Sequence, residues 1–378
     1  MRKRKIAFYI ESMVVGGAEK VLIDLVNHLD PNKYEIAVIA LFKRSVYEEY
    51  VAQFEEGFAA HVKYRYLIDN SNPMKYRLFN YVQNKMGWKC LYRYLIKEAF
   101  DLEVAFYEGW PTAFVAKSTQ RSNKIAWLHT GQHRLYHKIS QELNRRKYND
   151  YKNFDLIIGV SNAVAKSFKD VFPDLSPQVL YNPFDIKAIR LKSEVEIELS
   201  QKKYCLNFIT VGRLIPVKGY DRLLRALSKC RERGYYFHLT MIGDGSESEY
   251  LKKLVRDLDL DEDVFFAGHL PNPYPYIKKA DCLVCSSHHE GLSTVVIESL
   301  IVGTSVLTTA CEGMEEILGA SGAGLICENS EEGIFGMLEQ IFKKPDILSD
   351  LKKNTQARGN HFSVEKCTSH LDELLDAL

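Results

Sequence analysis

The sequence lacks any apolar run long enough to cross a bilayer, which takes about 18 to 20 consecutive apolar residues. Its basic start, Met1 to Lys5, is followed by only five apolar residues before Glu11. This pattern predicts a first β-strand, whereas a signal peptide has a longer apolar segment. We therefore expect a cytoplasmic chain.

Cysteine pairs at metal-binding or disulfide spacing are also scarce. The eight cysteines are scattered, and several stand inside apolar runs, which indicates reduced thiols in a protein core. Cys282 and Cys285 form a C-x-x-C pair, but no second pair or histidine couple accompanies them at zinc spacing. The sequence therefore predicts no metal site. We recognise no nucleic-acid-binding module either, and we expect no nucleic-acid partner.

The formal net charge of +1 hides an uneven distribution. Residues 1–200 carry a charge of +7 and the remainder −6, and residues 61–152 hold 17 basic against 7 acidic side chains. Aromatic residues are interleaved with them: Tyr64, Tyr66, Tyr76, Phe79, Tyr81, Trp88, Tyr92 and Tyr94. Such a face is typical of proteins that bind an anionic membrane surface or an anionic acceptor. A solvated helix with its aromatics in the core would have the same composition.

The length of 378 residues suits two domains. Short apolar runs alternate with helical periodicity, which predicts an α/β protein with doubly wound parallel sheets. The first series of expected strands is 5–10, 35–41, 61–67, 102–107, 124–128 and 155–160. A second series is 206–211, 237–241, 264–267, 282–285, 305–308 and 324–327. A long basic helical region is expected over 73–99.

Three segments follow from this alternation. We expect an N-terminal Rossmann-like domain over residues 1–182 and a second Rossmann-like domain over residues 183–360. The tail, residues 361–378, has apolar residues at helical spacing, so we expect a helix that packs back across the domain boundary.

Residues 286–300, SSHHEGLSTVVIESL, place Glu290 and Glu298 on either side of a strand-to-helix turn. A loop at the carboxyl end of a parallel strand, closed by a helix N-terminus, is where open α/β sheets bind anionic ligands. Glu298 stands among apolar residues, so its carboxylate needs a partner, and a ligand hydroxyl is one candidate. The alternative is that both carboxylates are solvated surface groups.

Three other turns that directly follow predicted strands contain candidate ligand-binding residues. Arg213 and Lys218 flank the turn after the 206–211 strand and could bind a phosphate, or could be ordinary surface charges. Gly16 and Gly17 precede the first helix, where glycine lets backbone N–H groups approach a ligand. The polar turn 129–133 begins with His129, which could donate a hydrogen bond to a ligand or transfer a proton near neutral pH.

These segments resemble a known family. GRLIPVKGYDRLLRAL, MIGDGSESEYL, AGHLPNPYPYIKKADCLVCSSHHEGLSTVVIESL and the N-terminal GGAEKVLIDL are similar to glycosyltransferase family 4, the retaining GT-B transferases. The resemblance covers nearly the whole chain and is strongest over residues 212–302. It implies a GT-B fold, in which two Rossmann-like domains face each other across a cleft.

The resemblance also implies roles for the residues of the C-terminal domain. Arg213 and Lys218 would hold the diphosphate of a nucleotide sugar and offset the charge of the leaving group. Glu298 would bind the ribose hydroxyls, and Glu290 the hydroxyls of the donor sugar beside the reacting carbon.

The remaining implied roles belong to the turn before the second helix segment and to the N-terminal domain. Gly291, Leu292 and Ser293 would offer backbone N–H groups to the donor, and Thr294 would begin the helix behind them. From the other domain, Gly17 would approach the diphosphate, and His129 would contact the donor sugar in the catalytic pocket.

The implied reaction is hexosyl or N-acetylhexosaminyl transfer from a UDP-sugar, with retention and without a metal or other cofactor. The acceptor would be a glycan or lipid-linked molecule in bacterial surface polysaccharide synthesis, at the inner face of the cytoplasmic membrane. A UDP-sugar 2-epimerase on the same scaffold and a non-catalytic two-domain sugar-binding protein are the alternatives. Residues 311–317 follow the family pattern only loosely, which leaves the role of Glu316 open, and residues 70–120 match nothing specific.

Overall fold

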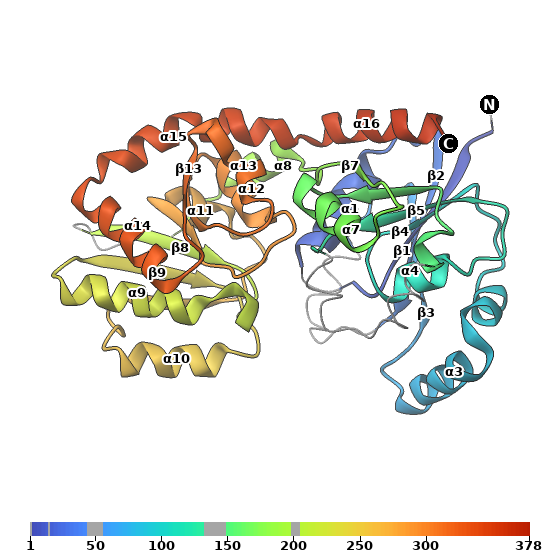
Figure 1. The fold of residues 1–378 in the computed structure, drawn as a ribbon, viewed down its shortest axis with the longest axis horizontal. Coiled ribbons are helices and arrows are strands. Elements are labelled where there is room, and N and C mark those ends of the chain that lie inside the picture. Colours follow the sequence, from blue (N-terminus) through green and yellow to red (C-terminus); the bar gives the residue numbers. More distant parts are fainter. Residues whose placement is uncertain (1, 14–15, 44–55, 132–148, 198–204) are drawn as a thin grey trace. The chain divides into compact units, whose positions relative to one another are not determined.

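The computed structural model (Figure 1) describes residues 2–13, 16–43, 56–131, 149–197 and 205–378. Contacts within the chain divide it into two units. Unit 1 comprises Met1–Phe184 and Val364–Leu378, and unit 2 comprises Asp185–Ser363. The division after Phe184 falls two residues beyond the predicted domain boundary.

Unit 1 is built on a seven-stranded sheet in the order β3-β2-β1-β4-β5-β6-β7. Every neighbouring pair is parallel. The strands are β1 (Arg4–Ile10), β2 (Tyr34–Phe42), β3 (Val62–Ile68), β4 (Leu102–Ala105), β5 (Asn123–Leu128), β6 (Leu156–Gly159) and β7 (Gln178–Val179). The apolar runs of the sequence therefore mark the first six of these strands to within one or two residues at each end, whereas the two-residue strand β7 was not among those expected. The strand order reverses between β1 and β4.

Within the described part of unit 1, the helices are α1 (Gly17–His28), α3 (Pro73–Leu95), α4 (Trp110–Val115), α7 (Asn162–Val171) and α16 (Val364–Asp376). The C-terminal helix α16 packs against α1. Two polar contacts hold it there, because Asp372 accepts a hydrogen bond from Tyr34 at 2.8 Å and pairs with Lys33 at 2.9 Å. The tail thus returns to the first unit after the chain has passed through the second.

Unit 2 repeats the arrangement with six parallel strands in the order β10-β9-β8-β11-β12-β13. The strands are β8 (Leu206–Val211), β9 (Phe237–Ile242), β10 (Val264–Gly268), β11 (Cys282–Cys285), β12 (Ser305–Thr309) and β13 (Gly324–Cys327). Both units therefore have doubly wound parallel sheets, as the sequence predicts. In unit 2 the order reverses between β8 and β11.

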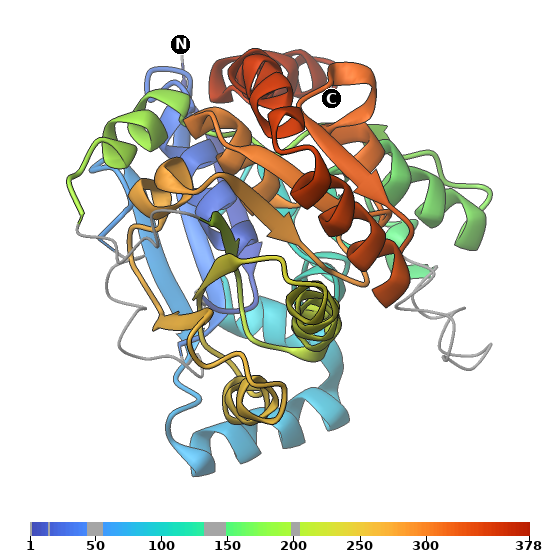
Figure 2. The ribbon, with the colours of Figure 1, turned by 90° about the vertical axis from the view of Figure 1, so that its left-hand side faces the viewer.

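Helices cover both faces of the unit 2 sheet. One layer contains α9 (Tyr220–Glu232), α10 (Ser248–Asp257) and α14 (Glu331–Lys343), which share one apolar core. Figure 2 shows α9 and α10 end-on, beside each other. The second layer contains α8 (Ile186–Ser193), α11 (Tyr274–Lys279), α12 (Thr294–Val302) and α15 (Asp346–Gly359). A short helix, α13 (Met314–Ile317), lies between β12 and β13 in the chain.

Candidate functional site

Two loops meet where the strand order of unit 2 reverses. The loop after β8 contains residues 212–219, and the loop after β11 contains residues 286–293. His288 N donates to Val217 O at 2.8 Å, and Ser286 Oγ donates to Lys218 O at 2.9 Å. Because the carboxyl ends of diverging parallel strands leave a crevice for ligands, the two segments singled out by their sequence form one candidate site.

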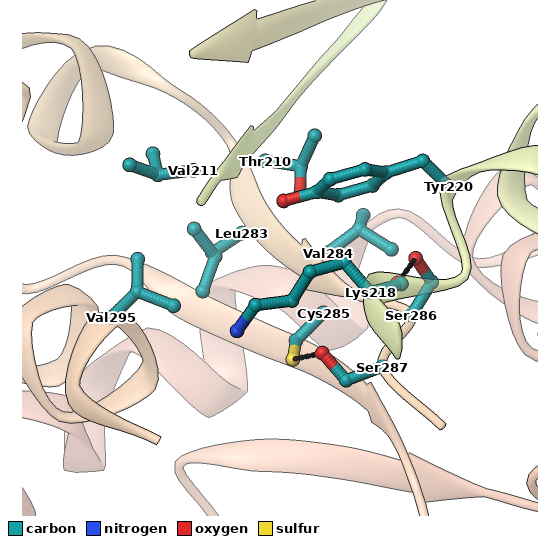
Figure 3. A pocket seen from close by; sticks show the side chains of 10 residues that line it. All are labelled: Thr210, Val211, Lys218, Tyr220, Leu283, Val284, Cys285, Ser286, Ser287 and Val295. Atoms are coloured by element: carbon teal, nitrogen blue, oxygen red, sulfur yellow. Dashed lines mark hydrogen bonds between the residues drawn. The ribbon is translucent and has the colours of Figure 1, made fainter. Parts of the chain in front are cut away.

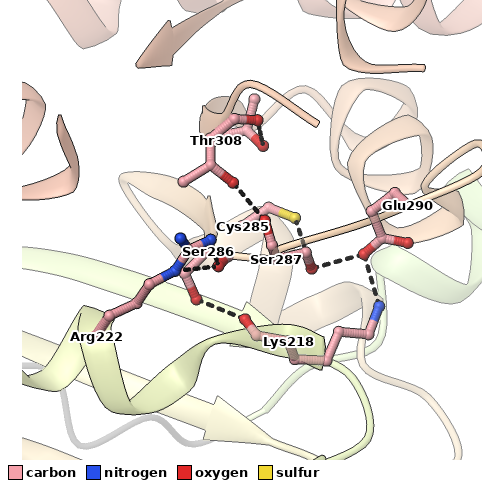
Figure 4. Close-up of polar contacts among 8 residues, drawn as sticks. Lys218, Arg222, Cys285, Ser286, Ser287, Glu290 and Thr308 are labelled. Carbon is pink, nitrogen blue, oxygen red and sulfur yellow. Dashed lines mark hydrogen bonds and ion pairs between the residues drawn. The ribbon is translucent and has the colours of Figure 1, made fainter. Parts of the chain in front are cut away.

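The centre of this site is an ion pair between Lys218 and Glu290 (Figure 4). Lys218 Nζ lies 2.7 Å from Glu290 Oε1, and Ser287 Oγ donates to the same oxygen at 2.7 Å. The side chains are only 20% and 13% exposed. Burial, the largest single influence, would lower the pKa of Lys218, but the combined interactions with Glu290, Tyr220 and Cys285 outweigh it and the pKa is raised. Lys218 is therefore protonated at neutral pH and pairs with Glu290 as an ammonium ion.

A small cavity lies beside this pair, between the ends of β8 and β11 (Figure 3). Tyr220 and Cys285 line it together with Lys218 and Ser287. Burial raises the pKa of Tyr220 to about 12, and burial together with the charge of Glu290 raises the pKa of the Cys285 thiol. Both groups keep their protons at neutral pH, so the charges at the cavity are those of Lys218 and Glu290.

Arg222 holds the loop after β11 in place, a role that sequence reasoning missed. Its side chain is buried, and Nε and Nη2 donate to Ser286 O at 3.0 and 2.6 Å. A third nitrogen, Nη1, donates to Asn329 O at 3.3 Å. In the sequence it is one of several basic residues of a helix, and no local signal separates it from the exposed ones.

Gly219 lets the two loops approach each other closely. Its φ of +60° is in the left-handed region, and a Cβ there would lie 2.5 Å from Ser286 O and 2.6 Å from Arg222 Nε. Any other residue would therefore be strained and would push the loops apart.

Glu298 is buried in α12, and its carboxylate accepts a hydrogen bond from the Tyr274 hydroxyl at 3.3 Å. The sequence predicts a partner for this carboxylate, and the Tyr274 hydroxyl is such a partner within the protein. Tyr274 is on α11, and sequence reasoning gave it no role. That Glu298 also binds a ligand hydroxyl stays a prediction.

The turn before α12 holds the predicted backbone donors. Thr294 begins the helix as expected, and Ser293 stands at its N-cap position without capping it. The Ser293 hydroxyl is buried and has no hydrogen-bond partner among the described residues. A buried hydroxyl beside a helix N-terminus suits an anionic ligand. Gly291 and Leu292 precede it in the same turn, and Leu292 is buried.

Arg213 belongs to the loop after β8 but stands apart from the ion pair. Its side chain is exposed, while the next residue, Leu214, is tied by its N–H to Asp244 O at 2.9 Å. The structure therefore brings Lys218 and Glu290 into contact and leaves Arg213 as an exposed cation of the same loop.

Unit 1 has its own candidate residues at the carboxyl edge of its sheet. Gly17 begins α1 after β1, and His129 directly follows β5. Glu108, which follows β4, accepts hydrogen bonds from the backbone N–H groups of His129 and Thr130, both at 2.8 Å. Glu108 is buried and was not recognised from the sequence. It fixes the backbone that carries His129.

The imidazole of His129 packs against aromatic rings. It stacks on Tyr107 with ring centroids 5.5 Å apart and lies 4.8 Å from the ring of Phe106. Burial lowers its pKa to about 3, so the ring is neutral near pH 7. A ring with so low a pKa is a weak proton acceptor near neutral pH, and a hydrogen bond from His129 to a ligand stays a prediction. Residues 132 and 133 of the same predicted turn lie outside the described residues.

Within the described ranges, no group of three or more His, Cys, Asp or Glu side chains is arranged to hold a metal ion. Four acidic residues, Asp259, Asp261, Glu262 and Asp263, lie between α10 and β10, at the amino end of that strand. Asp263 there pairs with Arg231 at 3.0 Å. This acidic run is at the opposite edge of the sheet from the Lys218 and Glu290 pair.

The chain is similar to bacterial glycosyltransferases, to one of them over nearly its whole length. One relative is the N-acetylgalactosamine-N,N'-diacetylbacillosaminyl-diphospho-undecaprenol 4-alpha-N-acetylgalactosaminyltransferase of Campylobacter jejuni. The two sequences are 25% identical over 382 aligned residues, which are 96% of this chain and 97% of that one. The chain is also 32% identical over 169 residues to the lipopolysaccharide core biosynthesis glycosyltransferase LpsE of Rhizobium meliloti, which covers 44% and 48%.

Solved structures have the same fold. Anabaena Alr3699/HepE in complex with UDP and glucose matches with a TM-score of 0.75 at 20% identity, over 99% of this chain and 100% of that one. Sucrose-phosphate synthase from Thermosynechococcus elongatus matches with a TM-score of 0.77 at 16% identity, over 99% of each chain. The predicted GT-B fold is thereby confirmed.

Two family models divide the chain almost as its units do. Residues 15–188 match the model described as Glycosyltransferase Family 4. Residues 196–358 match the model described as Glycosyl transferases group 1. The ion pair of Lys218 and Glu290 falls in the second of these regions. The chain belongs to the glycosyltransferase family that these two models describe.

Proposed function

We propose that the chain is a retaining transferase that moves a hexosyl or N-acetylhexosaminyl unit from a UDP-sugar to a glycan or lipid-linked acceptor. The observation that carries the proposal is the Lys218 and Glu290 ion pair at the strand-order reversal of unit 2. A buried ammonium there suits a diphosphate, and a carboxylate with one oxygen bound by Ser287 suits sugar hydroxyls.

In this proposal the leaving group supplies the base. The bond from the anomeric carbon to the diphosphate oxygen breaks, and the acceptor hydroxyl attacks from the same face. Its proton passes to the departing diphosphate, which gives UDP and the new glycoside. Lys218 and Arg213 offset the charge that develops on the diphosphate, which is the main catalytic contribution expected of the protein. His129, neutral at pH 7, serves as a hydrogen-bond partner for the donor sugar.

The other donor contacts come from the turn before α12. The N–H groups of Gly291, Leu292 and Ser293 face the donor in this proposal, and Ser293 adds its unpaired hydroxyl. Glu298, held by Tyr274, binds the ribose hydroxyls. Gly17 brings the N-terminus of α1 to the diphosphate. The proposed reaction needs no metal ion.

The names of two similar proteins support the choice of donor and acceptor. HepE was crystallised with UDP-glucose, and the Campylobacter transferase is named for a diphospho-undecaprenol acceptor. We therefore propose a UDP-sugar and a lipid-linked glycan, used at the inner face of the cytoplasmic membrane. The association that we propose is peripheral. Among the described residues, no helix is both long and apolar enough to span a bilayer.

Calorimetry with UDP, GDP and ADP tests the donor site. We expect selective UDP binding that is weakened in Arg213→Ala and in Glu298→Ala. Arg225→Ala is the matched control, because Arg225 is an exposed arginine of α9 that contacts Tyr250. If no nucleotide binds, or if Arg225→Ala weakens binding as much as Arg213→Ala, the proposed donor site is wrong.

Turnover assays separate the transferase from its alternatives. The proposal predicts transfer to an acceptor with retained anomeric configuration, measured by proton NMR of the product. Turnover of UDP-N-acetylglucosamine without an acceptor would instead indicate a 2-epimerase. Tight sugar binding without any turnover would indicate a binding protein.

A further inference from the structure

Helix α3 of unit 1 presents apolar side chains on two sides. On its inner side, Phe79 is buried and packs against Phe42 and Trp110, with ring centroids 5.4 and 6.1 Å away. On its outer side, Met74 is 77%, Leu78 63% and Tyr81 62% exposed. A helix that only covers a sheet has polar residues on its outer side, so this outer side requires another explanation.

The exposed residues form a single stripe. Met74, Leu78, Tyr81 and Lys85 follow one another at steps of four, three and four residues, which places them on one side of a helix. Exposed Arg77 lies beside the stripe. We call these five residues the outer face of α3. The helix lies at the margin of unit 1, beside β3 (Figure 1).

The charge of this segment has one sign. Residues 70–97 contain six lysines and arginines and no aspartate or glutamate. An apolar stripe bordered by cations is the pattern of helices that lie in the interface of an anionic bilayer. The apolar side chains enter the headgroup region, and lysine and arginine bind the lipid phosphates.

The inner side of the helix packs on the core of unit 1. The rings of Trp88 and Trp110 meet edge to face with centroids 5.1 Å apart, and Trp88 also packs on Phe114 at 5.8 Å. Gly87, with φ 74°, kinks the helix between the outer face and this aromatic cluster. The outer face and Phe79 both lie before Gly87, so the packing of Phe79 on Phe42 and Trp110 anchors the segment that carries the outer face.

We propose that the outer face of α3 docks on the surface of an anionic lipid bilayer. Met74, Leu78 and Tyr81 enter the headgroup layer, while Arg77 and Lys85 bind lipid phosphates. The proposal deepens the proposed function, since it assigns the membrane contact of that function to one helix. It is tested without donor or acceptor, so that it can fail or succeed separately.

The experiment is sedimentation of the full chain with vesicles of phosphatidylcholine containing 30% phosphatidylglycerol, and with pure phosphatidylcholine. We expect binding only to the anionic vesicles and a clear loss at high salt. Two α3 variants probe the two kinds of contact, namely Arg77→Glu with Lys85→Glu, and Leu78→Ser with Tyr81→Ser. Each is expected to lower vesicle affinity at least tenfold. In the first variant two basic residues are lost, each of which contributes several-fold in affinity near an anionic surface. In the second, the buried apolar area of two side chains is lost.

The matched control is Lys253→Glu with Arg256→Glu, which makes the same change of net charge at two exposed residues of α10. We expect this control to lower affinity by less than threefold. Circular dichroism and thermal melting establish that each variant is folded, and UDP binding by the α3 variants is expected to equal that of the wild type. If the wild type binds anionic vesicles but neither it nor any variant binds UDP, the proposed function is refuted and the docking proposal stands.

Three results would overturn the docking proposal. One is no binding of the wild type to anionic vesicles. Another is a loss in the α10 control as large as in Arg77→Glu with Lys85→Glu. The third is a wild-type dimer that Leu78→Ser with Tyr81→Ser converts to a monomer while vesicle binding is unchanged, because the stripe would then be a subunit interface.

Discussion

Replacing His129 by phenylalanine tests the structure of unit 1 independently of any assumption about activity. Phenylalanine keeps a ring against Tyr107 and Phe106 but cannot take up a proton. In the folded chain, burial lowers the pKa of His129 to about 3, whereas an unfolded histidine has a pKa of about 6.5. Below pH 6.5 the unfolded state therefore binds a proton that the folded state does not.

The sign and size of the effect follow from this difference. A lowered folded pKa contributes stability that is present above about pH 6.5 and is lost as the pH falls toward 3. Between pH 7.5 and pH 5 the loss for one such histidine is about 2 kcal/mol. For a unit of this size, that corresponds to a change in Tm of about 4 to 8 °C.

Calorimetric melting of wild type and His129→Phe at pH 7.5 and pH 5 measures the effect. We expect the wild type to lose about 4 to 8 °C more than the variant over this range, because all other titrating groups are shared. His370→Gln, which removes an exposed imidazole of α16, is the control and should follow the wild type. Parallel changes of Tm in wild type and His129→Phe would refute the buried, neutral imidazole.

The other predictions concern the unit 2 site and its support. Lys218→Met and Glu290→Gln should each lower kcat by about 100-fold or more, as expected for groups that stabilise transition-state charge, and steady-state kinetics with near-normal values for both would exclude these roles. Arg222→Leu should lower kcat/KM by about tenfold through loss of the bonds that hold Ser286 O, with partial rescue by Arg222→Lys; unchanged kinetics would contradict a positioning role. Gly219→Ala should destabilise the protein by at least about 1 to 2 kcal/mol in denaturant unfolding, and a neutral result would contradict the close loop contact. Activity should survive dialysis against EDTA, and restoration of lost activity by a divalent cation would refute a metal-independent reaction.

The strands could be predicted because each is a short apolar run between polar turns. Those runs also place the residues that follow each strand at one edge of the sheet, so Lys218 and Glu290 could be assigned to a common site before their contact was known. The contact between Lys218 and Glu290 depends on the conformation of two loops. The spacing of apolar residues predicts strands and helices but not loop conformation. For the same reason Ser287 was recognised only as part of a polar turn.

Helix α15 shows why other elements escaped prediction. Its buried positions include Thr355 and Gly359, and a Cβ on Gly359 would lie 2.8 Å from the backbone of Ile301 in α12. The other two buried positions, Leu348 and Leu351, are the only large apolar ones, and so short an apolar stripe gives a weak helical pattern in the sequence. Arg222 and Tyr274 were missed for a related reason, because a buried polar side chain is recognised by its partners, and these are distant in sequence.

The ion pair limits how the roles of Lys218 and Glu290 can be divided. The resemblance implies that one binds the diphosphate and the other the sugar, yet the two groups neutralise each other at 2.7 Å. Removing either would leave the other as a poorly solvated, unpaired charge, which is more destabilising than losing both. When a diphosphate binds Lys218, its negative charge takes over part of the stabilisation of the ammonium group that Glu290 otherwise provides. The hydrogen bond from Ser287 still holds the Glu290 carboxylate in place to bind sugar hydroxyls. The double variant Lys218→Met with Glu290→Gln should therefore lose less free energy of unfolding than the sum of the losses in the two single variants. It should remain inactive.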